Sequence, residues 1–213
     1  MNRPLTPQIL LQAYAAGIFP MAESQQDEEI FWIDPKLRGI LPLDKFHISR
    51  SLRRIILANA YTIRTNSDFS TVVNSCADRP VTWINGPIFA LYQSLHEQGF
   101  AHSLEVWDGD DLIGGVYGVA LGGAFFGESM FSRRTDASKI ALAYLVDRLR
   151  QGGFALFDTQ FLTPHLQSLG GMEISREAYR GLLRQALEIG ADFHRAGQPP
   201  SAAGVIHRNS QTS

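Results

Sequence analysis

The segment from residue 101 to residue 128 places the strongest constraint on the fold. It contains two β-type runs, AHSLEVWD and LIGGVYGVALGGAFFGE, joined by the turn residues GDD. Apolar runs rich in β-branched and aromatic residues, separated by Gly and Asp, are typical of paired antiparallel strands. The next run, ASKIALAYLVDRLRQGG, has the composition of a helix that ends in glycines, and FALFDTQF resembles a further strand. The sequence therefore predicts an antiparallel meander followed by a helix and a strand.

Helices are predicted on both sides of this meander. The first has Thr6 as its cap, Pro7 at its first position and Gly17 at its end. Further helical segments are RSLRRIIL, DFSTVVNSCAD, GPIFALYQSLHEQG, TPHLQSLGG and SREAYRGLLRQALEIG. This order indicates an α+β or mixed-sheet fold rather than a doubly wound one. A meander followed by a helix and a strand suits an N-acyltransferase fold, that is, an acetyltransferase-like (GNAT) domain.

The chain divides by composition into three parts. Residues 1–46 are irregular and proline-rich after the first helix, which predicts a short N-terminal domain that packs against the remainder of the protein. Residues 47–195 then form the catalytic domain. The final stretch, 196–213, shows no periodicity and is expected to be a disordered tail.

Composition excludes several classes of protein. With 45% hydrophobic residues in 213, the chain can bury a substantial core, and its net charge of −2 gives no overall basic surface for nucleic acid. A polyanion would therefore have to contact a local patch. The single cysteine, Cys76, rules out an internal disulfide, and the histidines show no metal-ligand spacing, so we expect no metal. No apolar run approaches ~20 residues, so we expect a soluble, cytoplasmic protein. We also expect a monomer.

The strand FALFDTQF carries a polar pair. Strict alternation places Asp158 and Gln160 on one face and Phe157, Thr159 and Phe161 on the other. An acid and an amide two residues apart can hold a polar group, such as an amine that attacks an ester. A solvated strand end is the simpler interpretation, and the strand alone favours it.

The stretch GESMFSRRTDASK contains two carboxylates and three cations. Glu128 ends an apolar run, where an unpaired carboxylate is costly. It either pairs with Arg133 or Arg134 in a structural turn or holds a cationic amine. Arg133, Arg134 and Lys139 surround a predicted helix start, which suits an anion such as an RNA phosphate, although a solvated helix end is equally simple. The glycine spacing of a phosphate-binding loop is missing, so an acyl-CoA site is poorly supported.

A second basic group lies in RSLRR. Arg50, Arg53 and Arg54 fall at helical spacing and form a modest basic stripe, which alone is typical of a solvated helix face. Tryptophans near prolines or turns, including Trp32 and Trp83, either cover the core or stack on a base. The residues by themselves thus indicate a mixed α/β domain with one unusual polar strand face and two basic patches.

The motifs together resemble the bacterial leucyl/phenylalanyl-tRNA–protein transferases. They run from about Leu10 to Tyr179 and include LLQAYAAGIFP, LPLDKFHISRSLRR, TWI, GESMFSR, ASKIAL and HLQSLGGMEISREAY. The resemblance implies an acetyltransferase-like domain that uses no cofactor. It implies transfer of Leu, Phe or sometimes Met from aminoacyl-tRNA to proteins that begin with Arg or Lys, which marks them for N-end rule degradation.

The resemblance also implies roles for particular residues. Asp158, Gln160 and Glu128 would take part in peptide-bond formation. Residues implied to bind the aminoacyl-adenosine end are Trp32, Trp83, Phe125, Val116, Ser129, Met130 and Leu145. Residues implied to contact tRNA are Arg50, Arg53, Arg54, Arg133, Arg134 and Lys139.

The chain departs from the family pattern at several positions. FWIDPK replaces a double-tryptophan segment, so adenine stacking at Trp32 is in doubt. Val116 stands where a methionine can line the side-chain pocket, and Leu145 replaces a usual large residue, so the donor preference is open. Two alternatives to the transferase function are an acyl-CoA N-acyltransferase and a noncatalytic binder of RNA ends.

Overall fold

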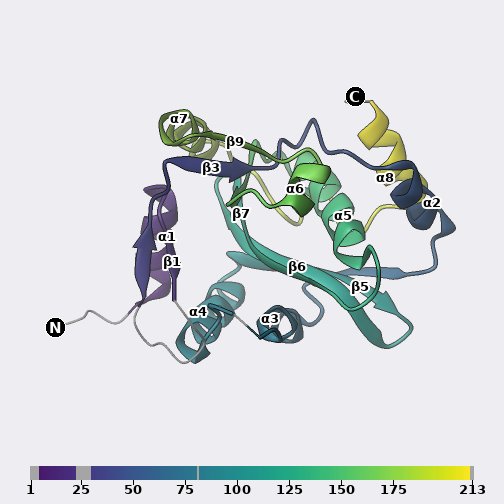
Figure 1. Ribbon diagram of the computed structural model, residues 1–213, viewed down its shortest axis with the longest axis horizontal. Coiled ribbons are helices and arrows are strands. Elements are labelled where there is room, and N and C mark those ends of the chain that lie inside the picture. The colour runs from purple at the N-terminus through teal and green to yellow at the C-terminus, as the bar shows by residue number, and fades with distance from the viewer. Residues whose placement is uncertain (1–4, 23–29, 81, 212–213) are drawn as a thin grey trace.

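A computed structural model describes residues 5–22, 30–80 and 82–211 of the chain. A seven-stranded mixed sheet runs through its centre (Figure 1). In order across the sheet, its strands are β4 (Thr62–Thr65), β5 (Ala101–Asp108), β6 (Asp111–Leu121), β7 (Ala124–Ser132), β8 (Leu156–Gln160), β3 (Leu37–Ile40) and β9 (Met172–Ser175). All neighbours are antiparallel except β7 and β8, which are parallel. The predicted meander is therefore confirmed, and the fold is α+β.

Helices cover both faces of this sheet. They are α1 (Pro7–Ala15), α2 (Arg50–Ala58), α3 (Phe69–Ala77), α4 (Gly86–Glu97), α5 (Ala137–Gly152), α6 (Pro164–Ser168), α7 (Arg176–Leu187) and α8 (Ala202–Ser210). A separate two-stranded ribbon pairs β1 (Phe19–Met21) with β2 (Phe31–Ile33). Among the described residues, no helix combines the length and the apolar composition needed to cross a membrane.

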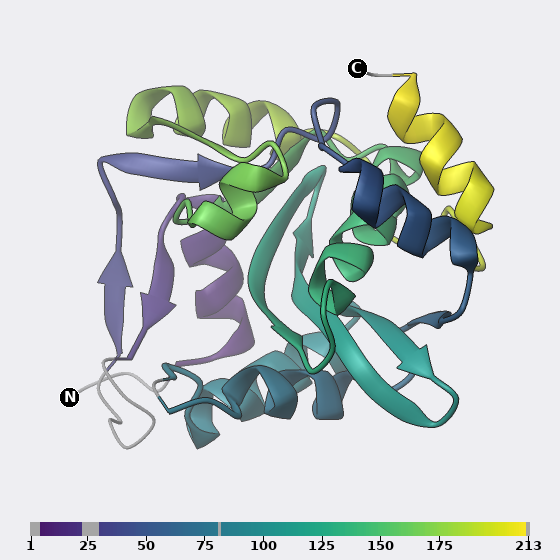
Figure 2. The ribbon, with the colours of Figure 1, turned by 45° about the vertical axis from the view of Figure 1, so that its right-hand side comes forward.

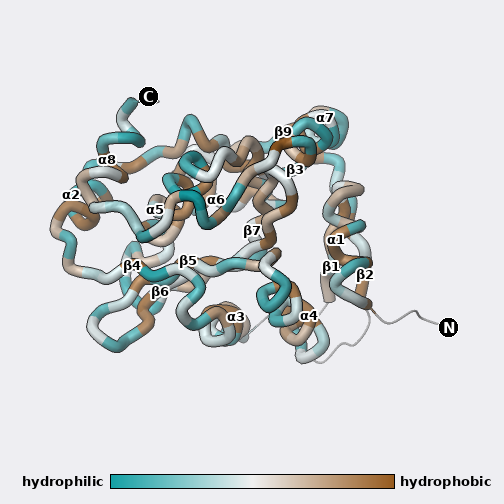
Figure 3. Tube along the Cα trace, turned by 180° about the vertical axis from the view of Figure 1, so that it is seen from behind, coloured by the Kyte–Doolittle hydropathy of each residue, from teal (hydrophilic) through white to brown (hydrophobic). Residues whose placement is uncertain are grey.

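Alternation along the central strands divides the core into two clusters. Phe125 and Phe126 are neighbours on β7, yet the first packs in a cluster with α2, α5 and α8, and the second in a cluster with α1, α3, α4 and α7. Successive side chains of a strand point to opposite faces, which accounts for this division. Seen from behind, α3 and α4 lie together on one side of the sheet, and hydrophobic colour follows β7 through the middle of the fold (Figure 3).

The first helix forms as its sequence predicts. Thr6 Oγ accepts a hydrogen bond from the Ile9 amide, Pro7 occupies the first helical position, and Gly17 follows the helix with φ of 82°. Leu10 and Tyr14 of this helix are fully buried. This helix therefore brings a tyrosine hydroxyl from the N-terminal region into the core.

Two features differ from the sequence-based expectation. Strand β7 continues to Ser132, so Glu128 lies within the strand and not at its end. Strand β3, from the stretch assigned to the N-terminal domain, lies inside the main sheet between β8 and β9. The irregular, proline-rich composition around it hid this four-residue strand, because a strand paired on both sides needs no long periodic run.

The expected disorder of the tail is wrong for its described part, because residues 202–210 form α8. Figure 2 shows α8 beside α2. Val205 and Ile206 are buried in the core, and Arg208 forms a two-pronged ion pair with the nearly buried Asp147 of α5, at 2.7 and 2.8 Å. Polar composition suggested disorder because this apolar patch spans only one turn of helix. Residues 212–213 lie outside the described residues.

Removing the Arg208 side chain should loosen α8. In Arg208→Ala, Asp147 would keep only the hydrogen bond from Gln151, and leaving a buried charged group underbonded costs about 1–3 kcal/mol. Urea unfolding should therefore show a lower free energy of unfolding for this variant. The exposed Arg195 is the matched control, and Arg195→Ala should change the free energy by less than about 0.5 kcal/mol. Equal values for both variants would mean that the tail contributes nothing to stability.

Candidate active site

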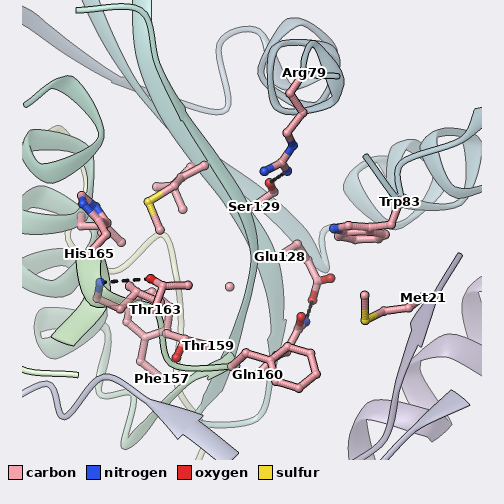
Figure 4. A pocket seen from close by; sticks show the side chains of 16 residues that line it. Met21, Arg79, Trp83, Glu128, Ser129, Phe157, Thr159, Gln160, Thr163 and His165 are labelled. Carbon is pink, nitrogen blue, oxygen red and sulfur yellow. Dashed lines mark hydrogen bonds between the residues drawn. The ribbon is translucent and has the colours of Figure 1, made fainter. Parts of the chain in front are cut away.

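A cavity of about 470 Å³ opens at the middle of the sheet, where β6, β7 and β8 lie beside α5 and α6. Figure 4 shows its two ends: Glu128, Gln160, Trp83 and Met21 lie on one side, and His165 and Thr163 on the other. The remaining lining residues are Arg79, Val116, Gly127, Ser129, Met130, Leu142, Phe157, Thr159, Phe161 and Leu166. Polar and apolar walls thus face one space.

Glu128 reaches the cavity through a β-bulge. Tyr117 pairs with Ser129 and Gly118 with Gly127, so Glu128 is an extra residue on β7 with no partner on β6. A bulge re-aims a side chain at the point where it interrupts the ladder. Gly118 permits the close approach, because a Cβ atom there would lie 2.3 Å from the Phe126 carbonyl oxygen. The sequence GVYGV therefore carries a local cause for the bulge.

The Glu128 carboxyl is buried among uncharged donors. Its Oε1 accepts from the Tyr14 hydroxyl at 2.6 Å and from the Gln160 side-chain amide at 3.1 Å, and its Oε2 shares a hydrogen bond of 2.6 Å with the Tyr92 hydroxyl. Burial raises the pKa of this carboxyl to about 7, although the three hydrogen bonds act in the opposite direction. Glu128 is thus placed to titrate near neutral pH at the cavity wall.

The alternative in which Glu128 pairs with a nearby arginine is wrong. Arg133 donates to Ser75 Oγ and to the Leu112 carbonyl, while Arg134 pairs with Asp108. Both arginines lie beyond the end of β7, which stops at Ser132. The carboxyl and the cations therefore belong to separate environments.

Asp158 lies behind the cavity wall and does not line it. The Arg38 guanidinium donates to both of its carboxylate oxygens, at 2.9 and 2.6 Å. The Tyr179 hydroxyl and the Gln160 backbone amide add bonds of 2.6 and 2.8 Å, and Asp158 itself is 0% exposed. With four donors and no open side, this carboxylate fixes the end of β8 in place.

Gln160 breaks the alternation expected for its strand. Its φ of 62° turns the backbone into the left-handed region, which is rare for a residue other than glycine, Asn or Asp. As a result its amide points to Glu128, and Phe157, Thr159 and Phe161 line the same cavity. Backbone strain of this kind persists where the surroundings hold it. Here the backbone N–H of Gln160 donates directly to the Asp158 carboxylate.

The apolar wall differs in two positions from the expected one. Val116 and Met130 line the cavity as expected, together with Leu142, Phe157 and Leu166. Leu145 and Phe125 do not: both are about 1% exposed within the core, and Phe125 packs edge-on against Phe154 and Phe157. On α5 the residue that borders the cavity is Leu142, which lies one turn nearer the start of the helix than the expected Leu145.

The two tryptophans are placed differently. Trp83 lines the cavity, and its ring meets that of Tyr92 edge-on at 6.3 Å. Trp32 lies on β2 with 41% of its surface exposed, and it is not among the residues that line the cavity. Ser129 lines the cavity and accepts a hydrogen bond from Arg79 at 2.7 Å. Trp83 and Ser129 therefore share one wall, and Trp32 stands apart from it.

Sequence analysis did not identify several residues of this site. Tyr14 and Tyr92 each lay inside a predicted helix with no further signal, because burial is what gives a phenol hydroxyl a specific partner. Arg38 had no signal, since its carboxylate is 120 positions away. The other such residues are Met21, Arg79, Leu142, Thr159, Phe161, Thr163, His165, Leu166 and Tyr179.

The basic side chains lie on two separate elements. Arg50, Arg53 and Arg54 are exposed on α2, and none forms an ion pair within the described ranges. At the start of α5, Lys139 pairs with Asp136 at 2.7 Å and Arg134 pairs with Asp108. The α2 stripe is therefore the freer cationic surface of the two.

Breaking the Arg38–Asp158 pair should unfold the site. Arg38→Met leaves a fully buried carboxylate without its cation, which costs about 3–5 kcal/mol when a buried pair loses one partner. The double variant Arg38→Met, Asp158→Leu should recover part of that loss, because it removes the stranded charge. Chemical denaturation of the three proteins provides the measurement. An Arg38→Met protein as stable as the parent would show that the pair is not buried in solution.

Comparison with known proteins places the chain in a family. The family model for the leucyl/phenylalanyl-tRNA protein transferase matches residues 40–184, and the model for the N-terminal domain of the same proteins matches residues 3–36. Two relatives described as leucyl/phenylalanyl-tRNA–protein transferases, from Cereibacter sphaeroides and a Ruegeria species, are each 64% identical over 98% of this chain and 98–99% of their own.

More distant matches add little to this. A relative from Roseobacter denitrificans with the same description is 62% identical over 98% of this chain and 99% of its own. Among solved structures, that of L-PGS from Bacillus licheniformis aligns at a TM-score of 0.46 and 14% identity, covering 87% of this chain and 77% of that one. The matches to the sequence confirm the resemblance that its motifs indicated: the chain belongs to the leucyl/phenylalanyl-tRNA–protein transferase family.

Proposed function

We propose that this protein transfers an amino acid from aminoacyl-tRNA to the N-terminus of an acceptor protein. The observation that carries the proposal is one cavity lined both by apolar side chains, including Val116, Met130 and Leu142, and by the polar groups of Glu128 and Gln160. An aminoacyl ester needs both, because its side chain is apolar and its reacting carbonyl meets an amine.

The donor amino acids are Leu and Phe, with Met as a further candidate, and the acceptors begin with Arg or Lys. The apolar wall supports the donors, since branched and aromatic side chains gain from burial against Val116, Leu142 and Phe157. The acceptor choice, the link to N-end rule degradation, the cytoplasmic location and the monomeric state rest on the family. The acetyltransferase-like fold is likewise a proposal, supported by the meander, α5 and the parallel β7–β8 pair.

Positioning supplies most of the catalysis in this proposal. An activated ester and an amine react readily once they are held together, and well-oriented reactions gain ~7–11 kcal/mol because the freedom of the reactants is already restricted. Gln160 and Glu128 contact the polar end of the substrates, and Trp83 lies where it can stack on the terminal adenine. Asp158 acts through the backbone of Gln160. With four donors already on its oxygens, it serves to orient and not to accept a proton.

The tRNA is proposed to contact the basic residues of α2 and of the α5 start. Arginine forks suit phosphate, and Arg50, Arg53 and Arg54 are exposed. Arg133, Arg134 and Lys139 would first have to leave their partners in the chain. The stripe on α2 therefore carries the larger share of the attraction.

A transfer assay tests the function directly. The protein receives radiolabelled Leu-tRNA or Phe-tRNA together with peptides that begin with Arg, Lys, Asp or Ala. Label on the Arg and Lys peptides alone is the expected result. Label on Asp would mean that the acceptor site has diverged, and tRNA binding without transfer to any peptide would support the noncatalytic RNA-end binder.

Two leucines on α5 allow the cavity wall to be told apart from the core, because Leu142 lines the cavity and Leu145 does not. Leu142→Ala shortens a side chain of the apolar wall and so enlarges the cavity. Transfer of Leu should therefore fall by roughly tenfold or more relative to transfer of Phe, whose larger ring still reaches the wall. Leu145→Ala is the matched control because its side chain faces the core. That variant should lose about 2–5 kcal/mol of stability and keep the donor ratio. A ratio that changes in Leu145→Ala and not in Leu142→Ala would reverse the assignment.

The α2 stripe should set the salt dependence of tRNA binding. Replacing Arg50, Arg53 and Arg54 with Ala should weaken binding and flatten the plot of log affinity against log salt concentration by about 0.7–0.9 for each phosphate that is no longer neutralised. Arg134→Ala should flatten it less, because Asp108 already neutralises that side chain. Filter binding at several salt concentrations measures both slopes, and an unchanged slope in the triple variant would remove α2 from the tRNA surface.

A further inference from the structure

Three oxygen-bearing groups meet in a closed triangle at the polar end of the cavity. The Tyr14 and Tyr92 hydroxyls lie 2.7 Å apart, and each lies 2.6 Å from a different oxygen of the Glu128 carboxyl. The three groups come from α1, α4 and β7, and all are buried. Every side of this triangle has the length of an O–H···O hydrogen bond.

Counting hydrogens identifies the protonation state that this geometry needs. Three O–H···O hydrogen bonds require three hydrogens, and the two tyrosine hydroxyls supply only two. If Glu128 were ionised, one pair of oxygens would face each other at 2.6–2.7 Å with no hydrogen between them. A carboxylic acid supplies the missing hydrogen and closes the ring.

The Gln160 amide fixes the direction of that ring. It donates to Oε1, so Oε1 acts as the carbonyl oxygen and accepts twice, from Gln160 and from Tyr14. The carboxyl hydrogen then lies on Oε2 and is donated to the Tyr92 oxygen, and Tyr92 in turn donates to Tyr14. Each hydroxyl in this arrangement gives one hydrogen bond and receives one.

The charged and titratable neighbours do not supply a counter-charge to Glu128. Asp158 on β8 is neutralised by Arg38 on β3, and Arg79, after α3, bonds Ser129. Burial raises the pKa values of Tyr14, Tyr92 and Tyr117 well above 10 and that of Cys76 on α3 to about 12, so all four remain neutral. Among the described residues, no salt bridge involves Glu128.

We propose that Glu128 is a carboxylic acid in the folded protein, that Tyr14 and Tyr92 are positioning residues that orient it within this ring, and that the acid is the proton donor of the transfer reaction. The chemical role rests on the proposed function, whereas the protonation of Glu128 stands on the geometry of the ring alone. Tyr14 on α1 and Tyr92 on α4 thereby have a role, although binding of the aminoacyl group does not require them.

The proton balance of the reaction fits this role. The amine nitrogen bonds to the ester carbonyl carbon, and the bond from that carbon to the ribose oxygen breaks. The nitrogen loses one proton, and the ribose oxygen gains one. Glu128 gives its proton to the ribose oxygen and receives the proton that the nitrogen releases, so the enzyme ends in its starting state.

Protein stability tests the protonation without any transfer assay. Glu128→Gln keeps the ring, because the new amide nitrogen donates to Tyr92 and the amide oxygen accepts from Tyr14. An unfolded glutamate ionises above pH ~4.3, whereas Glu128 in the folded protein keeps its proton up to pH about 7. The stability from this raised pKa is present below pH ~4.3 and is lost as the pH rises toward 7. Urea midpoints at pH 5 and pH 8 report it.

The expected result is a difference that grows with pH. Glu128→Gln should gain stability relative to the parent between pH 5 and pH 8. Tyr117→Phe is the matched control: Tyr117 is fully buried, its ring lies 5.4 Å from that of Tyr92, and its hydroxyl has no partner within the described part of the chain. Its difference from the parent should be the same at both pH values. A constant difference for Glu128→Gln, or failure of that variant to fold, would overturn the proposal.

Transfer kinetics then test the chemical role. Glu128→Gln should bind aminoacyl-tRNA as the parent does but lose roughly 10²–10⁴-fold in kcat, the usual contribution of a general acid. Tyr14→Phe and Tyr92→Phe should each lose roughly fivefold in kcat with KM retained, as expected when one hydrogen bond of ~1 kcal/mol is removed. Tyr117→Phe should keep the parent's kcat.

The two levels of the proposal fail separately. If the parent protein transfers no amino acid, the proposed function fails while the stability result still reports on the ring. If the parent is active and Glu128→Gln keeps its kcat, the proton-donor role is wrong. A fall in kcat that Tyr117→Phe shares would mean that the tyrosines act only through packing.

Discussion

The buried ion pair between Arg38 and Asp158 is the interaction on which the site depends. Arg38 also donates to the Gly17 carbonyl and the Tyr179 hydroxyl, so one guanidinium ties the end of α1 and the start of α7 to the sheet strands β3 and β8. Its flat face lies 4.5 Å from the rings of both Phe19 and Tyr179. Because a buried charge must be fully bonded, this pair locks four segments to a single geometry.

That geometry reaches the cavity through the backbone. Asp158 accepts a hydrogen bond from the backbone N–H of Gln160. This bond holds Gln160 in its left-handed conformation and turns its side chain toward Glu128. The two acids of the site therefore have different tasks. Asp158 is paired with Arg38 and fixes the backbone, whereas Glu128 has uncharged partners and a pKa raised to about 7 by burial, which suits proton transfer.

Local sequence rules predicted the elements but not their long-range partners. The helix cap at Thr6, the meander and the helix after it all depend on residues a few positions apart, and they are present. The polar residues Asp158, Gln160 and Glu128 were noticed because polar groups in an apolar strand are conspicuous, but the strand alone favoured a solvated end, and their roles were implied only by the resemblance. The features that were missed depend on contacts far apart in the chain: β3 inside the sheet, Arg38 behind Asp158, and the tyrosines of α1 and α4 around Glu128. Leu145 was expected in the pocket from the resemblance alone, and the residue that borders the cavity is Leu142, because a helix position cannot by itself tell which turn faces a cavity.

The position of β3 has a consequence for how the chain folds during synthesis. This strand is made early, yet both of its neighbours, β8 and β9, come more than a hundred residues later. Until those strands leave the ribosome, residues 37–40 have no partners and Arg38 has no carboxylate. Contacts so distant in sequence form slowly, because a long loop must close before they can form. Strand β3 must therefore wait in an unpaired state, and the active site is completed only after β8 and β9 have been made.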